Sequence, residues 1–290
     1  MKLVAPRWLY CGMIAFLAAA ISAHYLFGSP VAAIWISFAS REAAYAWGTC
    51  LCLLVAAEYK RQPLLRMAWL LLAANGLVSI VRHVLESRTL EQWPPVHLWR
   101  HATITLALLL LLGGIWAMAQ AFVKAGLGFR IHRTDGIAVA MIFGVLCVIL
   151  VFRDQLSEAS MPLPGPRVLQ ISSQVVIALA AAFSVALHRI IVDMGGGKLA
   201  ISMRFLVAHI LGRVLLVLLS QTFKSQLAFS ADTEFAFTLG FDVMTWVFAL
   251  AAAYRATMFA AALQQAPPRP DQILALQLDQ RWAREVSEKL

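Results

Sequence analysis

Three ionisable side chains, His209, Arg213 and Asp242, stand well away from the ends of the last two long apolar runs of this chain. His209 and Arg213 are four residues apart in the run 199–223, so on a helix they share one face. Asp242 stands in the run 235–259. A charged group in lipid needs a partner, and counting helical turns places Arg213 and Asp242 at similar depth. We therefore expect a charge-assisted hydrogen bond between these two side chains.

This expected pair has two interpretations. It either fixes only the register of two neighbouring helices, or it lines a polar cavity together with His209. In the second case the three side chains form part of a ligand-binding site inside the membrane.

A second group of polar side chains flanks the connection between the third and fourth apolar runs. Its members are Arg82, His83, Glu86, His97, Arg100 and His101. The connection is short, so these groups must be near neighbours. Two histidines four residues apart suit a shared metal ion, but no carboxylate lies between them and no H-E-x-x-H motif is present. Clustered arginine and histidine with few acids favour a polar cap at the membrane surface or an anion-binding mouth.

Haem is another ligand to weigh, because a membrane haem takes two axial histidines from facing helices. Only His83 and His101 match in depth, so the sequence leaves the cofactor unknown. We find no nucleophile elbow and no complete phosphate-binding loop, and we favour a role other than catalysis. The ligand-binding candidates are His209, Arg213, Asp242, Arg82, His83, Arg100 and His101.

The composition requires a lipid environment around these residues. Of the 290 residues, 61% are hydrophobic and only 13% are charged, whereas soluble domains carry about a quarter charged residues. Eight apolar runs have lengths near those that helices need to cross a membrane. They cover residues 8–27, 31–57, 64–85, 98–122, 136–152, 168–192, 199–223 and 235–259. The sequence thus predicts an all-α integral membrane protein, a polytopic bundle of about eight transmembrane helices over residues 1–262.

Two of the runs carry an ambiguity. The first follows Lys2 and Arg7 and resembles a signal peptide, but we treat it as retained. The second is interrupted by the charged pair Arg41 and Glu42. We expect this pair near a membrane interface, where the Arg41 side chain extends toward the headgroups.

The sequence predicts a proline-rich linker and a cytoplasmic amphipathic helix over residues 263–290. Pro267, Pro268 and Pro270 end the last run, and Asp271 is a suitable N-cap for the segment that follows. Apolar residues then recur every four positions, at Leu274, Leu278, Trp282, Val286 and Leu290. The helix either lies on the membrane surface or mediates a homodimer or a larger membrane complex.

The net charge of +9 is explained by basic residues that hold the short connections on the inner side of the membrane. The basic residues stand in short connections between apolar runs, as the positive-inside rule describes, and we expect no nucleic-acid partner. Their distribution favours two cytoplasmic termini in a multi-pass protein of an inner or plasma membrane, with the lipid bilayer as its immediate partner.

The layout across the whole chain, a multi-helix membrane region that ends in an amphipathic helix, is similar to the N-terminal membrane regions of bacterial sensor kinases. The resemblance implies a sensor or signal-transducing module that binds a small or lipid-like ligand within the bundle. The alternative is a membrane subunit of a multi-protein redox complex, associated with haem or quinone.

Overall fold

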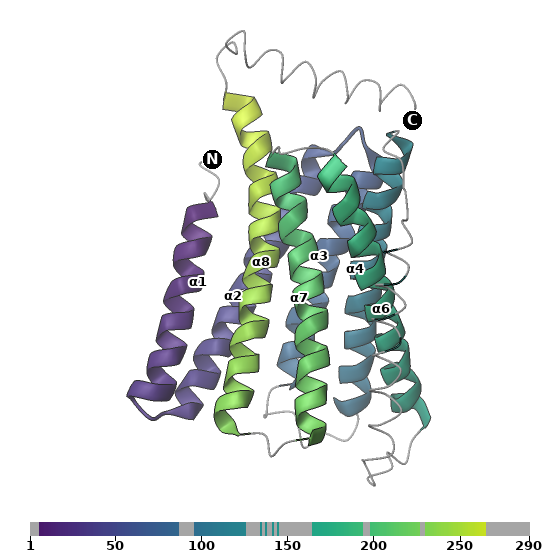
Figure 1. Cartoon of the computed structure of the whole chain (residues 1–290). Coiled ribbons are helices and arrows are strands. Elements are labelled where there is room, and N and C mark those ends of the chain that lie inside the picture. Colours follow the sequence, from purple (N-terminus) through teal and green to yellow (C-terminus); the bar gives the residue numbers. More distant parts are fainter. Residues whose placement is uncertain are drawn as a thin grey trace.

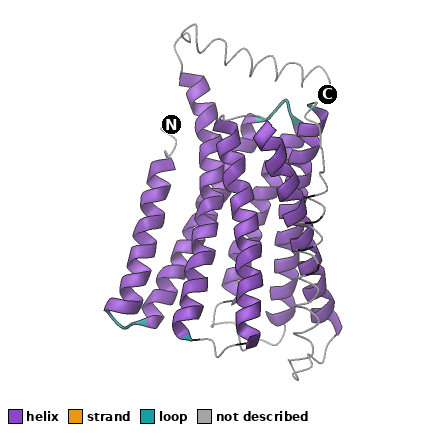
Figure 2. Cartoon of the chain, in the orientation of Figure 1, coloured by secondary structure: helices purple, strands orange, loops and turns teal. Residues whose placement is uncertain are grey.

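The structure is a computed structural model that describes residues 6–86, 96–125, 164–193, 198–226 and 230–264, together with positions 134, 137, 141 and 144. Every regular element among these residues is helical, and Figure 2 shows no strand in the described part of the chain. The elements are α1 (Pro6–Ile21), the short π-helical η1 (Ser22–Leu26), α2 (Pro30–Glu58), α3 (Pro63–Glu86), α4 (Val96–Lys124), α6 (Pro164–Asp193), α7 (Lys198–Gln226) and α8 (Ala231–Gln264).

These helices confirm the expected class of protein. Six of them are long and apolar enough to cross a membrane, so the chain is an all-α polytopic membrane protein. Helices suit this environment because every backbone N–H and C=O in lipid must find its hydrogen-bond partner within the protein. The apolar run 136–152 falls largely outside the described residues, and the amphipathic segment 271–290 falls wholly outside them. The count of eight crossings therefore stays a prediction.

Proline marks the start of several helices. α1, α2, α3 and α6 each begin at a proline, at positions 6, 30, 63 and 164. A proline fits the first helical position because its missing N–H would have no partner there and its fixed φ already matches the helix. Before α2 the chain turns at Gly28, whose φ of +56° is a backbone conformation that residues with a Cβ rarely adopt.

The helices pack as a closed ring with one helix outside it. Going around the ring, neighbouring helices are α2, α3, α4, α6, α7 and α8, and α8 packs in turn against α2. α1 packs on the outside, against α2 and α8, at one edge of the bundle in Figure 1. The start of α1 and the end of α8 lie at the same end of the bundle, which we call the terminal end.

The interior of the ring is mainly apolar toward the terminal end, although Ser202 of α7 and Arg255 of α8 are also buried there. Its largest fully buried side chains there include Trp69 and Leu72 of α3, Met118 of α4, Leu206 of α7 and Leu250 of α8. They belong to one continuous core to which all seven long helices contribute. Burial of this kind gives each helix a fixed rotation, and so fixes which polar side chains face inward in the other half of the bundle.

One expectation about the second apolar run is wrong. α2 is a single helix from Pro30 to Glu58, and Arg41 lies about 16 Å from its start and about 26 Å from its end, at a rise of about 1.5 Å per residue. Arg41 and Glu42 therefore stand well inside the bundle and not at a membrane interface. The side chain of Arg41 is only 19% exposed.

Candidate ligand-binding site

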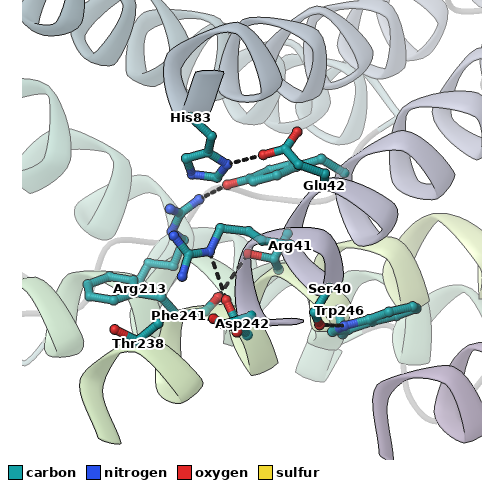
Figure 3. A network of polar contacts seen from close by, with 12 residues as sticks. Ser40, Arg41, Glu42, His83, Arg213, Thr238, Phe241, Asp242 and Trp246 are labelled. Carbon is teal, nitrogen blue, oxygen red and sulfur yellow. Dashed lines mark hydrogen bonds and ion pairs between the residues drawn. The ribbon is translucent and has the colours of Figure 1, made fainter. Parts of the chain in front are cut away.

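Charged side chains from four helices meet inside the ring, in the half away from the terminal end. We call this group the charge layer, and it consists of Arg41 and Glu42 from α2, Arg82 and His83 from α3, Arg213 from α7 and Asp242 from α8. Figure 3 labels all of these residues except Arg82. Four of the seven residues proposed from the sequence are members: Arg82, His83, Arg213 and Asp242. The two groups that the sequence treated as separate are thus parts of one arrangement.

Asp242 is bound by residues of α2. The Arg41 Nε–H donates to Asp242 Oδ1 at 2.7 Å, and the Ser37 hydroxyl donates to Asp242 Oδ2. Asp242 is 1% exposed, so both carboxylate oxygens are satisfied inside the protein. The expected hydrogen bond between Arg213 and Asp242 is not formed. Instead, α2 packs against α8, and Arg41 and Ser37 of α2 occupy both carboxylate oxygens.

Arg213 has a neutral hydrogen-bond partner. One guanidinium N–H donates to the hydroxyl of Tyr45, and the guanidinium carbon lies 5.8 Å from the centre of the Tyr45 ring and 5.9 Å from that of Phe241. Tyr45 is completely buried. Among the residues that the structure describes, no carboxylate forms an ion pair with Arg213. The guanidinium thus lies between two aromatic rings and has no direct ion pair among the described residues.

His83 connects an arginine to a carboxylate. Its Nδ1 lies 2.7 Å from Glu42 Oε1, and its Nε2 faces an N–H of Arg82. Because arginine can only donate, Nε2 must accept, and the ring proton must therefore stand on Nδ1 and be donated to Glu42. His83 is thus neutral in this arrangement. Both ring nitrogens are engaged, which leaves neither of them for ligation of a haem iron.

Glu42 has one oxygen with no hydrogen-bond partner. Its Oε1 accepts from His83, while Oε2 is buried and receives no donor from the described residues. The carboxylate is 20% exposed at the side-chain level, so it is the less enclosed of the two acids in the layer. A buried acceptor without a donor is costly, and it marks a position where water or a ligand hydroxyl fits.

His209 forms a hydrogen bond between α7 and α8. Its Nδ1 lies 2.6 Å from the backbone carbonyl of Met244, and because a carbonyl only accepts, Nδ1 carries the proton. The ring is 1% exposed and packs at 5.4 Å from Phe248. His209 therefore joins α7 to α8 next to the charge layer and holds the helix that carries Arg213 in register.

The remaining candidates are at the start of α4. Arg100 and His101 lie in the first turns of that helix, but their side chains fall outside the part of the chain that the structure describes. The side chains of His97, also on α4, and of Glu86, the last residue of α3, likewise fall outside the described part. Their expected proximity to Arg82 and His83 therefore stays a prediction.

Arginines and acids alternate in the described part of the charge layer. Arg41, Arg82 and Arg213 are arginines, which stay protonated at any accessible pH, whereas Glu42 and Asp242 are acidic. Charges in a low-dielectric interior interact strongly, because screening by water is weak there.

Polar side chains extend beyond the layer along the same half of the ring. On α2, Arg41 and Glu42 come before the apolar Leu51. On α7, which runs in the opposite direction, Leu206 comes before Arg213. The same order holds on α3, where Trp69 and Leu72 precede Ser79 and His83, and on α4, where Thr105 precedes Ile115 and Met118. The ion pairs thus lie in one half of the interior, while the other half is mainly apolar and contains the buried Ser202 of α7 and Arg255 of α8.

Other buried polar groups serve helix packing. Asn75 of α3 donates to the carbonyl of Ala107 on α4 at 2.6 Å, as intramembrane amides commonly do. The indole N–H of Trp246 on α8 donates to the Ser40 hydroxyl of α2 at 2.9 Å. These bonds lie between neighbours of the ring, and they fix the helices that carry the charge layer.

Sequence reasoning missed Arg41, Glu42 and Tyr45 as site residues. The signal for the first two was present, because a charged pair ten residues inside a 27-residue apolar run lies too deep for an interface. No local pattern singled out Tyr45, since an isolated tyrosine in an apolar helix is a common core residue. Its role depends entirely on its neighbours in space.

Metal chemistry gains no support from the described residues, among which no three histidine, cysteine or acidic side chains gather as a metal site would require. Comparisons with protein-family models, with curated proteins and with solved structures find no match for this chain. The function must therefore be argued from the geometry of the charge layer.

Proposed function

We propose that this chain is a membrane sensor or signal-transducing module that binds a small or lipid-like ligand at the charge layer. The observation that carries the proposal is the layer itself, a buried set of ionisable groups on α2, α3, α7 and α8. Ionisable residues inside a membrane are costly to retain, and they are functional-site candidates by default.

The position of the ion pairs in one half of the ring supports a receptor rather than a pore. A ligand approaching from the end opposite the termini meets the charge layer, and beyond it the packed core of large apolar side chains closes the interior. The basic connections at the terminal end favour a cytoplasmic location for that end. In the proposed orientation the charge layer is therefore reached from outside the cell.

The path from ligand to output runs along α8. This helix carries Asp242 in the charge layer, and its end lies at the terminal end of the bundle, followed by residues 265–290 (Figure 1). A ligand that competes for Arg41 or repositions Arg213 changes the forces between α8 and its neighbours α2 and α7. Small shifts of a packed helix are a common form of signal in such bundles. The segment after α8 is the proposed output.

Ligand retention tests the binding half of this proposal. The full chain is purified from its native membrane in mild detergent, and small molecules released on denaturation are identified by mass spectrometry. We expect a compound in near-stoichiometric amount from the wild type and its loss from the Arg213→Gln variant. The matched control is Arg204→Gln, which removes an exposed arginine from the same helix. Equal ligand content in all three proteins contradicts the proposal.

Distance measurements test the signalling half. Spin labels at Arg204→Cys on α7 and Thr257→Cys on α8 report the separation of these helices at the terminal end, in a background without native cysteines. We expect the distance distribution to change when the retained compound is removed and added back. An unchanged distribution, combined with flux of the compound through proteoliposomes, identifies a transporter and rejects the sensor.

A further inference from the structure

We propose that the terminal end of the bundle binds anionic phospholipids through five exposed basic side chains, which we call the basic edge. Its members are Arg7 of α1, Lys60 and Arg61 between α2 and α3, Arg66 of α3 and Lys124 of α4. The inference goes beyond the proposed function, because the charge layer lies in the other half of the ring. It rests on the position of these cations, on the absence of ion pairs to them and on their apolar neighbours.

The directions of the helices bring the basic edge together. Arg7 stands one residue after the start of α1, and Arg66 stands three residues after the start of α3. Lys124 is the last residue of α4, while Lys60 and Arg61 follow the end of α2. Because α1 starts at the terminal end and the helices from α1 to α4 alternate in direction, all five positions fall at that end (Figure 1). Each of these four helices packs against the next, so the cations occupy one continuous side of the bundle.

No member of the basic edge forms an ion pair within the part of the chain that the structure describes. The ion pairs described there join His24 to Asp232, Arg41 to Asp242 and His83 to Glu42. Arg7 instead contacts the ring of Trp8, whose centre lies 5.7 Å from the guanidinium carbon. An anionic partner from outside the protein can therefore bind these cations without breaking an ion pair inside it.

Each member that stands on a helix has an exposed apolar side chain beside it. These neighbours are Trp8 after Arg7, Met67 after Arg66 and Val123 before Lys124, which are 62%, 45% and 41% exposed. A phospholipid satisfies both kinds of side chain, because its phosphate lies at the membrane surface and its acyl chains lie directly below. A nucleic acid or an acidic peptide in water would bind the cations and leave the apolar side chains exposed. An aromatic residue beside a basic one is also typical of a membrane interface.

The basic edge favours a lipid that carries net negative charge. Phosphatidylcholine holds a cation beside its phosphate and is neutral overall, whereas phosphatidylglycerol has the phosphate alone. A basic side chain at an anionic membrane surface gains about 1 kcal/mol, which corresponds to a roughly five-fold preference. Arginine can bind two phosphate oxygens at once, and lysine binds phosphate as a point charge.

The experiment uses the full chain in nanodiscs of phosphatidylcholine alone or of phosphatidylcholine and phosphatidylglycerol in equal parts. Lipids that stay bound after transfer into mild detergent are identified and counted by mass spectrometry. We expect the wild type to retain about five-fold more phosphatidylglycerol than phosphatidylcholine. It should also unfold at a higher temperature in the mixed nanodiscs. Soluble glycerol phosphate, added to nanodiscs of phosphatidylcholine alone, should not raise the unfolding temperature.

Variants assign the lipid binding to the basic edge. One protein combines Arg7→Gln, Arg66→Gln and Lys124→Gln, and its excess of phosphatidylglycerol should fall by at least about half, because most of the cations are gone. The matched control combines Arg7→Lys, Arg66→Lys and Lys124→Arg, which keeps every charge and should keep the excess. In phosphatidylcholine alone both proteins should unfold close to the wild-type temperature, since neither loses a described ion pair.

Several results overturn the inference. Equal retention of the two lipids by the wild type shows that lipid charge is not recognised. Unchanged retention by the glutamine variant places the anionic lipid elsewhere, and loss of the excess from the charge-preserving control shows that charge is not what is recognised. Stabilisation by glycerol phosphate identifies a free phosphate instead of a lipid. Binding of polyglutamate without any response to phosphatidylglycerol identifies an acidic protein partner.

Discussion

The ion pair between Arg41 and Asp242 provides the sharpest test of the architecture, because the sequence pointed to a different partner. The perturbations are Arg41→Gln, Asp242→Asn and the two together, each replacing a charged group by an amide of similar shape. Asp242 is 1% exposed and the side chain of Arg41 is 19% exposed, so the pair is largely withdrawn from water.

The expected magnitudes follow from this burial. Removal of one partner from a buried pair leaves the other charge uncompensated and costs about 3–5 kcal/mol. We place each single variant at the lower end, about 3 kcal/mol, because Arg41 is partly exposed and the Ser37 hydroxyl still bonds residue 242. The double variant leaves two neutral amides and should lose only about 2 kcal/mol. The coupling energy is then about 4 kcal/mol.

The assay is reversible unfolding of the full chain by sodium dodecyl sulfate in mixed micelles, followed by circular dichroism. A second cycle with Arg213→Gln and Asp242→Asn serves as the control, and its two effects should be closer to additive because no hydrogen bond joins these residues. If the Arg41–Asp242 cycle is additive within about 0.5 kcal/mol, or if the Arg213 cycle shows the larger coupling, the described pairing is refuted.

Three further predictions concern packing, the histidine bridge and topology. Gly76→Ala should destabilise the bundle by about 1–3 kcal/mol, because a Cβ there would collide with the Thr49 hydroxyl of α2. Gly113→Ala should cost less, because a Cβ there meets only a leucine methyl group at 3.3 Å. Equal unfolding temperatures of the two variants would contradict this prediction. His83→Phe removes the bridge between Arg82 and Glu42 and should lower the free energy of unfolding by about 2–3 kcal/mol. His83→Gln keeps a donor and an acceptor, so it should lower it less. Equal losses in the same unfolding assay would contradict the bridge. A cysteine at the exposed Lys60, in the connection between α2 and α3, should react with an impermeant maleimide only after the cells are opened, and labelling of intact cells would reverse the orientation.

The sequence alone determined the class of the protein and the placement of its helices. The apolar runs 64–85 and 199–223 match α3 (Pro63–Glu86) and α7 (Lys198–Gln226) within a few residues. The physical reason is local, since lipid imposes a minimum length and excludes unpaired backbone groups from any spanning segment. The same cost singled out Arg213 and Asp242 as residues that must have partners inside the bundle.

Only the tertiary structure decided which partners those are. Asp242 pairs with Arg41, which is 201 positions away in the chain, because α8 packs against α2 in the ring. Hydropathy gives the depth of a side chain to within a turn or two, but it does not give the order of helices around a ring or their rotation. Two arginines at similar depth were therefore indistinguishable as partners. The packing of α2 against α8 places Arg41 beside the carboxylate, and Arg213 has the Tyr45 hydroxyl as its hydrogen-bond partner instead.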